Sequence, residues 1–427
     1  MKVKLTEYEQ RMLNGEFGEF KQVALQNIVK YAEVLGAEEL CEVTKATVYL
    51  GAHPYLDVVN SDNYDEIFSE MLLCSDKTVK IDKFCENCFS QTCVAPCDQY
   101  VWEPLNLTEE FYKKNKRYLE ITKEAGVSIT GSCTPYLIGW IPLKGEHFVT
   151  TESSNVLMCN SVFGACGNSD GLEAAAWSAI CGRTPKWGNH VMENRKGTHL
   201  FKIECQAETA MDWDVIGYTL GKKLPPHAIP VVDGNFKRPN LIKLKQFFAS
   251  LATTSGAEMC HIVDLTPEAP TLEIAFGGKE PQEVITITQE DFDESMKNLC
   301  DAGSGSVDLV ILGCPHYTLE EIRNVALYLK DKKVKEGTQL MVWTDYAIKE
   351  MANVNGYTEI IEKAGGHILT SGCPLVIGHK CHENSKGMAM DGAKQAHYIR
   401  SETDARVYYG TVYECLDAAV AGKWEEK

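Results

Sequence analysis

Three cysteines share one local pattern, and this pattern is the strongest chemical signal in the sequence. Each follows a predicted strand and a glycine, and a proline lies within two residues after it; the three segments are Gly131-Ser-Cys133-Thr-Pro135, Gly313-Cys314-Pro315 and Gly372-Cys373-Pro374. Glycine permits unusual φ angles, and proline fixes φ and removes a backbone donor, so we expect each thiol at a rigid strand terminus. Three thiolates at one end of a sheet can hold three irons of a [4Fe-4S] cluster and leave the fourth iron free for substrate.

The segment after Cys314 adds to this prediction. Thr318 and Glu321 have capping-box spacing, so a helix is expected to start there with its positive end near the loop, which favours a thiolate. Two alternatives remain open. The three thiols are buried by coincidence, or one of them is a nucleophile with His316 as its base.

A second group of cysteines lies closer together in the chain, and it comprises Cys85, Cys88, Cys93 and Cys97. The C-x2-C spacing is suited to chelation, so this group is either an additional zinc or cluster site or a set of reduced or redox-active thiols. The remaining cysteines lie among apolar or mixed neighbours and are expected in the core: Cys41, Cys74, Cys159, Cys166, Cys181, Cys205, Cys260, Cys300, Cys381 and Cys415.

Composition restricts the class of protein. The 427 residues predict two or three domains, and 42 basic against 60 acidic side chains leave a net charge of −18. This charge disfavours nucleic acid and anionic membrane surfaces as partners. The first residues, MKVKLTEYEQ, lack the apolar segment of a signal peptide, and no apolar run approaches the length of a membrane span. We therefore expect a cytoplasmic protein with reduced thiols.

Hydrophobic periodicity predicts the elements that position the cysteines. Helical spacing covers the first 45 residues or so, and a helix from Thr108 to about Ala125, ended by Gly126, precedes a short strand at 127–130. In the C-terminal part, strands alternate with helices as in parallel βαβ units of a three-layer α/β domain; the strands are 307–312, 339–343 and 367–370, and the helices are 319–330 and 346–352. Ligands of such folds bind beyond the carboxyl ends of the strands. No glycine-rich phosphate loop follows a predicted strand, which disfavours a nucleotide-binding enzyme.

Several further motifs follow one another in a specific order: Gly-Ser-Cys133-Thr-Pro-Tyr-Leu, Gly145-Glu-His147, Glu152-Ser-Ser-Asn155, Asn160-Ser-Val-Phe-Gly-Ala165, Gly182-Arg-Thr-Pro185, Glu193-Asn-Arg195, Leu312-Gly-Cys-Pro-His316 and Ser371-Gly-Cys-Pro374. This ordered set resembles the catalytic, large subunit of the aconitase X family. The similarity covers most of the chain and is strongest over 126–200 and 305–400. The family comprises iron–sulfur hydro-lyases, including cis-3-hydroxy-L-proline dehydratases and mevalonate 5-phosphate dehydratases.

The resemblance implies a fold and a partner. The expected fold is α/β, with aconitase-like three-layer domains and parallel sheets but without the swivelling domain. The expected divisions are an N-terminal helical and cysteine-rich region over 1–125, a first α/β domain over 126–300 and a second over 301–427. Because the chain has the length of the large part alone, a separate small swivelling-domain subunit is implied. By the same resemblance, that subunit carries the catalytic base, an activated serine.

The resemblance also implies site residues. The metal ligands are Cys133, Cys314 and Cys373, which hold a [4Fe-4S] or a [2Fe-2S] cluster. Glu193 is a catalytic candidate that could shuttle a proton or position Arg195. His316, two residues beyond a proposed ligand, is a candidate for catalysis or for support of the ligands, and His147 is expected to be structural. The residues expected to bind the substrate are Ser153, Ser154, Asn160, Ser161, Asn168, Arg195 and Lys394.

Three functions remain after this step. The leading one is dehydration of a small hydroxy carboxylate, with cis-3-hydroxy-L-proline favoured because no basic cluster stands out as a phosphate site. The second is dehydration of mevalonate 5-phosphate, for which the partner subunit would supply the positive charge. The third is a non-catalytic metal or redox-sensing protein centred on the segment from Cys85 to Cys97.

Overall fold

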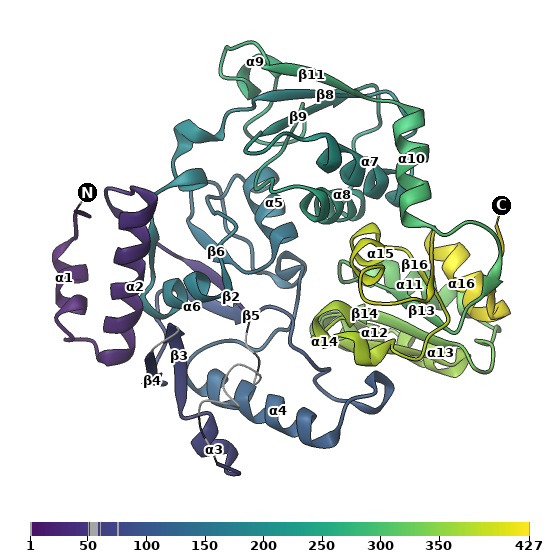
Figure 1. Cartoon of the computed structure of the whole chain (residues 1–427), viewed down its shortest axis with the longest axis horizontal. Coiled ribbons are helices and arrows are strands. Elements are labelled where there is room, and N and C mark those ends of the chain that lie inside the picture. The colour runs from purple at the N-terminus through teal and green to yellow at the C-terminus, as the bar shows by residue number, and fades with distance from the viewer. Residues whose placement is uncertain (1, 50, 52–58, 60, 75–76, 427) are drawn as a thin grey trace.

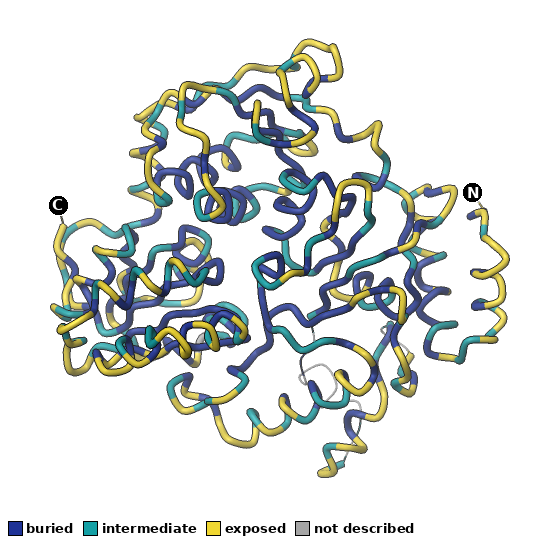
Figure 2. The backbone as a smooth tube through the Cα atoms, turned by 180° about the vertical axis from the view of Figure 1, so that it is seen from behind, coloured by how far each residue is buried: buried dark blue, intermediate teal, exposed yellow. Residues whose placement is uncertain are grey.

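The structure is a computed structural model, and it describes residues 2–49, 51, 59, 61–74 and 77–426. Three α/β units follow one another along the chain and meet at the centre of the molecule (Figure 1). The backbone is largely buried at this centre and exposed around the periphery (Figure 2). Within the described ranges, no helix combines the length and the apolar character that a bilayer span requires.

The first unit is built on a parallel sheet of order β5-β2-β6. Its strands are β2 (Lys45–Val48), β5 (Phe89–Thr92) and β6 (Phe148–Thr150). The helices of this unit are α1 (Glu7–Leu13), α2 (Glu19–Leu35), α3 (Tyr64–Ile67), α4 (Glu109–Glu124), α5 (Ser153–Ser161) and α6 (Leu172–Cys181). Two antiparallel pairs complete it, β1 (Leu40–Glu42) with β7 (Arg183–Pro185) and β3 (Glu70–Cys74) with β4 (Lys77–Lys80).

The second unit has a four-stranded parallel sheet of order β10-β9-β8-β11. Its strands are β8 (His199–Ile203), β9 (Pro230–Gly234), β10 (His261–Ile262) and β11 (Glu283–Ile287). The main helices are α7 (Ala210–Lys223), α8 (Leu241–Thr254) and α10 (Gln289–Leu299), with the short α9 (Leu272–Ala275). A β-carbon on Gly217 would lie 2.2 Å from the Phe247 carbonyl oxygen, so glycine allows α7 and α8 to pack closely.

The third unit has a five-stranded parallel sheet of order β15-β14-β13-β16-β17. Its strands are β13 (Leu309–Leu312), β14 (Gln339–Thr344), β15 (Gly366–Thr370), β16 (Gly387–Met390) and β17 (Arg406–Tyr409), and a small pair joins β12 (Gly305–Ser306) to β18 (Lys423–Trp424). The helices are α11 (Leu319–Leu329), α12 (Tyr346–Val354), α13 (Tyr357–Ala364), α14 (Pro374–Ile377), α15 (Ala393–Ile399) and α16 (Val412–Ala421).

Both faces of the central sheet in the third unit are buried. Ile311 and Met341 belong to the core shared with α7 and α8 of the second unit, whereas Val310 and Val342 pack with α11 and α16. Side chains alternate between the faces of a strand, so burial on both faces explains why these strands are continuously apolar.

The predicted α/β class and the strands and helices of the third unit are confirmed. The helix predicted from Thr108 is α4, capped by Thr108 and followed by Gly126 at a φ of 108°. The strand predicted over 127–130 forms only an isolated bridge, from Ser128 to Gln91. β6, which follows residue 126 in the chain, pairs with β2, which precedes it. The domain boundary expected between residues 125 and 126 therefore falls inside the first unit.

Candidate active site

The three cysteines of the repeated pattern line one cavity of about 290 Å³, where the first and third units meet. Its other lining residues are Val94, Glu152, Ser154, Gly313, Pro315, His316, Leu375, Val376, Lys394, Tyr398 and Glu402. The structure thus brings together Cys133, Cys314 and Cys373, although Cys133 lies in a loop of the first unit and the other two follow β13 and β15 of the third. The three loops that share the local sequence pattern therefore lie around one cavity.

Glycines beside the cysteines are required by close contacts between the loops. A β-carbon on Gly131, whose φ is 58°, would lie 2.6 Å from the Cα atom of Ser371 in the Cys373 loop. A β-carbon on Gly313, whose φ is 96°, would lie 2.3 Å from the Trp343 carbonyl oxygen on β14. Both positions favour glycine, because φ is positive and a side chain has no room. At Gly131 the crowding shows that the loops of Cys133 and Cys373 touch directly.

His316 connects all three cysteine loops. Its backbone N–H donates to the Cys133 sulfur at 3.3 Å, and its ring Nε2 lies 2.8 Å from the Gly372 carbonyl oxygen. A carbonyl only accepts hydrogen bonds, so Nε2 carries the proton and Nδ1 offers a lone pair. Burial lowers the pKa of His316 to about 4, which keeps the ring neutral at pH 7. Nδ1 is buried, and no described residue hydrogen-bonds to it.

Two residues that the sequence did not single out support these loops. Lys245 on α8 is fully buried, and its ammonium donates to the carbonyl oxygens of Pro315 at 3.0 Å and His316 at 3.1 Å. Glu321 lies 3.2 Å from the same ammonium and balances its charge. Asp98, also buried, accepts from the Thr370 hydroxyl at 2.9 Å and from the Thr370 backbone N–H at the end of β15. No local motif marks either residue, because each acts on a loop distant in sequence.

A charged pair occupies one wall of the cavity. The Lys394 ammonium lies 2.7 Å from a Glu152 carboxylate oxygen, which also accepts from the Ser154 hydroxyl at 3.2 Å. Burial alone would lower the pKa of Lys394, but Glu152 and the neighbouring thiols raise it above its ordinary value. Lys394 is therefore a fixed cation at the N-terminal turn of α15, directly beside the cysteines.

The donor set fits an iron–sulfur cluster. Burial raises the pKa of all three thiols, that of Cys373 to about 11, so thiolates in this cavity need a bound cation. Among the described residues, the sulfur atoms of Cys133, Cys314 and Cys373 do not all lie within 4.8 Å of one another, as the ligands of one ion would. A cluster, in which each thiolate binds a different iron, does not require the sulfur atoms to lie so close together.

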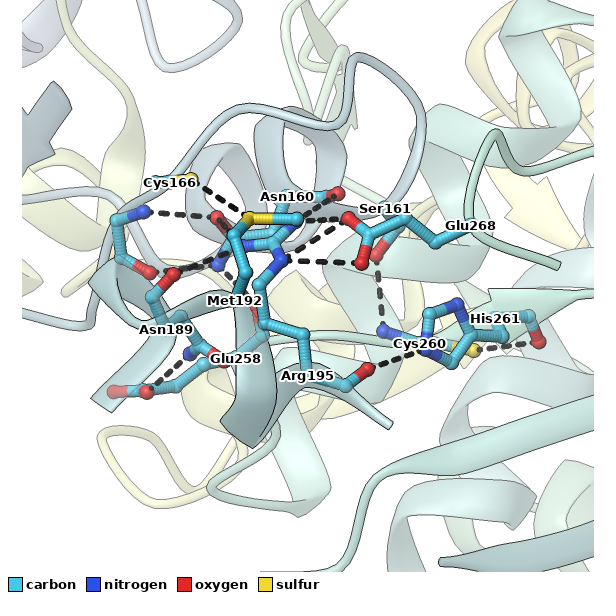
Figure 3. Close-up of polar contacts among 11 residues, drawn as sticks. Asn160, Ser161, Cys166, Asn189, Met192, Arg195, Glu258, Cys260, His261 and Glu268 are labelled. Atoms are coloured by element: carbon cyan, nitrogen blue, oxygen red, sulfur yellow. Dashed lines mark hydrogen bonds and ion pairs between the residues drawn. The ribbon is translucent and has the colours of Figure 1, made fainter. Parts of the chain in front are cut away.

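Four predicted substrate-binding residues lie elsewhere, in a buried network between the first and second units. Three of them, Asn160, Ser161 and Arg195, are labelled in Figure 3. Arg195 is fully buried, and its guanidinium donates to Glu268 at 2.6 and 3.0 Å, to the Asn189 carbonyl and to the Asn160 carbonyl. The Asn160 side chain spans the Gly167 and Glu258 backbones, and the Ser161 hydroxyl accepts from the Cys260 N–H. Asn168 bonds to the backbones of Trp187 and Asn189. These groups hold loops together and do not line the cavity.

The other predicted site residues, Ser153, Glu193 and the four cysteines from Cys85 to Cys97, do not line the cavity. Ser153 begins α5 next to the cavity without lining it, and Glu193 is exposed on the short helix over 192–195. The candidate second metal site does not assemble from its own four thiols: within the described residues, no three of them have sulfur atoms within 4.8 Å of one another. Cys85 lies against Gly182 at the end of α6, whereas Cys93 and Cys97 follow β5 toward the cavity.

Comparisons with known proteins agree with this geometry. Models of the aconitase X first, second and third domains match residues 2–193, 197–297 and 307–421. The chain is 32% identical over 418 residues to a phosphomevalonate dehydratase large subunit of Methanocaldococcus jannaschii, covering 96% of this chain and 99% of that one. It is 28% identical to a cis-3-hydroxy-L-proline dehydratase of Hypocrea jecorina, covering all of this chain and 70% of that protein.

The fold matches as well. The crystal structure of Thermococcus kodakaraensis aconitase X, in its holo-form, superposes with a TM-score of 0.81 at 27% identity and covers 98% of this chain. The three matched domains correspond to the three α/β units, and the cavity lies where the first and third of them meet. On the three domain matches and the relatives of nearly equal extent, this chain belongs to the aconitase X family.

Proposed function

We propose that this chain is the large subunit of an iron–sulfur hydro-lyase that removes water from mevalonate 5-phosphate. The observation that carries the proposal is that Cys133, Cys314 and Cys373 line one cavity together with the Lys394–Glu152 pair. The choice of substrate rests on relatives: phosphomevalonate dehydratase large subunits reach 32% identity, whereas the cis-3-hydroxy-L-proline dehydratases reach 28%. The lack of a basic cluster had favoured hydroxyproline, and these identities outweigh it.

The reaction breaks a C–H bond next to the substrate carboxylate and a C–O bond at the neighbouring carbon. The proton goes to a base, the electron pair forms the new double bond, and the hydroxyl leaves. Cys133, Cys314 and Cys373 would hold the cluster. When bound, an iron with an open position supplies the Lewis acid that a poor leaving group such as hydroxide requires.

The chain's own residues position the substrate. The Lys394 ammonium is assigned to an anionic group of the substrate, because an ammonium has three N–H donors and Glu152 occupies one of them. Pro315, Leu375 and Val376 form apolar walls, which exclude water and strengthen these charge interactions. His316 is neutral and holds the three cysteine loops in register, which makes it a positioning residue in this proposal.

The base is proposed to come from a partner. The phosphomevalonate dehydratase relatives are named large subunits, which implies a small subunit in those proteins. Among the described lining residues, the carboxylates are Glu152, held by Lys394, and Glu402 at the rim with 3.4 Å to His382. The small subunit would close the cavity, and a serine on it would take the proton, as the family resemblance implies.

The test is to purify the chain anaerobically, alone and with its small subunit, and to follow each candidate substrate by proton NMR. We expect loss of one water from mevalonate 5-phosphate only when both subunits are present. Turnover of cis-3-hydroxy-L-proline instead would transfer the proposal to that substrate. Absence of iron together with absence of dehydration would refute the hydro-lyase.

A further inference from the structure

A group of one cysteine and two histidines lies apart from the cavity, at the edge of the first unit. Cys41 is on β1, His147 directly precedes β6, and His190 is on the short helix over 188–190. The Cys41 sulfur and one ring nitrogen of each histidine lie within 4.8 Å of one another. Among the described residues this is the only such group of metal-binding side chains.

The two histidine rings face each other. Their Nδ1 atoms are 3.0 Å apart, and the ring planes are inclined by 48°. His190 is 2% exposed, and its Nε2 has no hydrogen-bond partner among the described residues, so its ring is oriented through Nδ1. Two nitrogen ligands bonded to zinc at about 2.0–2.1 Å in tetrahedral geometry are about 3.3 Å apart. The observed separation is therefore close to the one that a shared ion requires.

Backbone contacts hold the three residues in place independently of any ion. Cys41 pairs with Thr184 in the β1–β7 ladder, and its thiol lies 3.7 Å from the Thr184 carbonyl oxygen. His147 forms a parallel bridge with Cys166, and its carbonyl accepts from the Thr44 N–H at 3.0 Å. His190 N–H donates to the Trp187 carbonyl at 3.0 Å. A site held this firmly by its scaffold is preorganised for a ligand.

We propose that Cys41, His147 and His190 bind one divalent transition-metal ion, with zinc as the best match, through Sγ and the two Nδ1 atoms. Thiolate and imidazole are the ligands that zinc prefers, and a fourth position remains for water. The ion joins β1, the start of β6 and the loop after β7, three segments that lie far apart in the sequence. Since the site shares no residue with the cavity of Cys133, Cys314 and Cys373, the proposal is independent of the dehydratase function.

The experiment is a Co²⁺ and Zn²⁺ titration of the full chain after chelator treatment. Co²⁺ bound to a thiolate in tetrahedral geometry gives a near-ultraviolet charge-transfer band and intense visible bands. We expect one equivalent of Co²⁺ with both signals in the wild type, displaced by one equivalent of Zn²⁺. The Cys41→Ser variant should lose the charge-transfer band, and His147→Gln should weaken binding by more than tenfold.

Cys260→Ser is the matched control. Cys260 is also a buried thiol beside a backbone carbonyl, 3.6 Å from the His261 oxygen, but it belongs to no such group among the described residues. This variant should bind Co²⁺ like the wild type. A Cys133→Ser, Cys314→Ser, Cys373→Ser triple variant should do so too, which separates the site from the cluster cavity.

Thermal unfolding shows whether each variant is folded and whether Zn²⁺ stabilises it. Zn²⁺ should raise the Tm of the wild type and of Cys260→Ser, but not that of His147→Gln, because a ligand stabilises only the folded form that binds it. His147 is half-buried, so we expect its variant to fold. A wild type that binds no Co²⁺, or a charge-transfer band that persists in Cys41→Ser, would overturn the proposal.

Discussion

Replacement of Arg195 distinguishes a structural role from the substrate-binding role that the sequence suggested. The Arg195→Met variant removes a fully buried guanidinium and leaves Glu268, 7% exposed, as a buried carboxylate without its partner. Breaking a buried ion pair in this way costs about 3–5 kcal/mol. We therefore expect a large loss of stability from a residue that does not line the cavity.

The expected shift in Tm follows from the size of the protein. An unfolding entropy of about 2.1 cal/mol/K per residue gives about 0.9 kcal/mol/K for 427 residues that unfold cooperatively. The loss of about 3–5 kcal/mol then lowers the Tm by about 3–6 °C, which differential scanning calorimetry measures directly. The double variant Arg195→Met, Glu268→Met should recover part of this loss, because it leaves no unpaired charge.

Lys113→Met is the control, since the Lys113–Glu109 pair on α4 is exposed and screened by solvent. Its Tm should equal that of the wild type within error. If Arg195→Met had an unchanged Tm but a raised KM, the guanidinium would bind substrate and the structural reasoning would fail. Equal destabilisation by the single and double variants would show that the ion pair is not the source of the loss.

Three further predictions concern the cavity and a buried acid. Cys133→Ser, Cys314→Ser and Cys373→Ser should each lose bound iron and dehydration, whereas Cys159→Ser, a buried thiol on α5 outside the cavity, should retain both by iron analysis and NMR assay. Lys394→Met should lower kcat/KM about tenfold or more by removing a charged hydrogen-bond donor, with the Tm and the iron content reported alongside. Burial and the charge of Glu258 raise the pKa of Asp170 from 3.8 to about 7, so the folded state binds the proton more tightly and this stabilisation fades as pH rises from about 4 to 7. The stability of wild type relative to Asp170→Asn, from urea unfolding, should therefore fall over that range by at most about 1.4 kcal/mol per pH unit, and a difference that rises with pH would contradict the assignment.

The sequence was sufficient for features that depend on neighbouring residues. The glycine, cysteine and proline pattern marked three loops at strand ends, and all three line the cavity. The capping box at Thr318 and Glu321 begins α11 as predicted, and Thr108 caps α4. Such features can be recognised in the sequence because side chains a few residues apart determine helix caps and strand ends.

The sequence misled where polar residues stand in a family motif without lining the cavity. Asn160 and Arg195 could equally contact a substrate or a neighbouring loop. Only the packing of the second unit against the first shows that Arg195 donates to Asn160 and to Glu268. Their burial depends on the contact between units, which no periodicity encodes.

Tertiary structure alone decided the partners that are distant in the chain. Lys245 reaches the loop of Cys314 from another unit. Cys41 and His147 were expected to be core or structural residues and the sequence did not single out His190, yet the three meet in the structure. The sequence by itself determined the family, the α/β class and the three cavity thiols, because these depend on local residue patterns and on the order of the motifs. The charge pair, the supporting residues and the second cluster of ligands were decided by the fold, since only the docking of sheets and loops sets distances between side chains far apart along the chain.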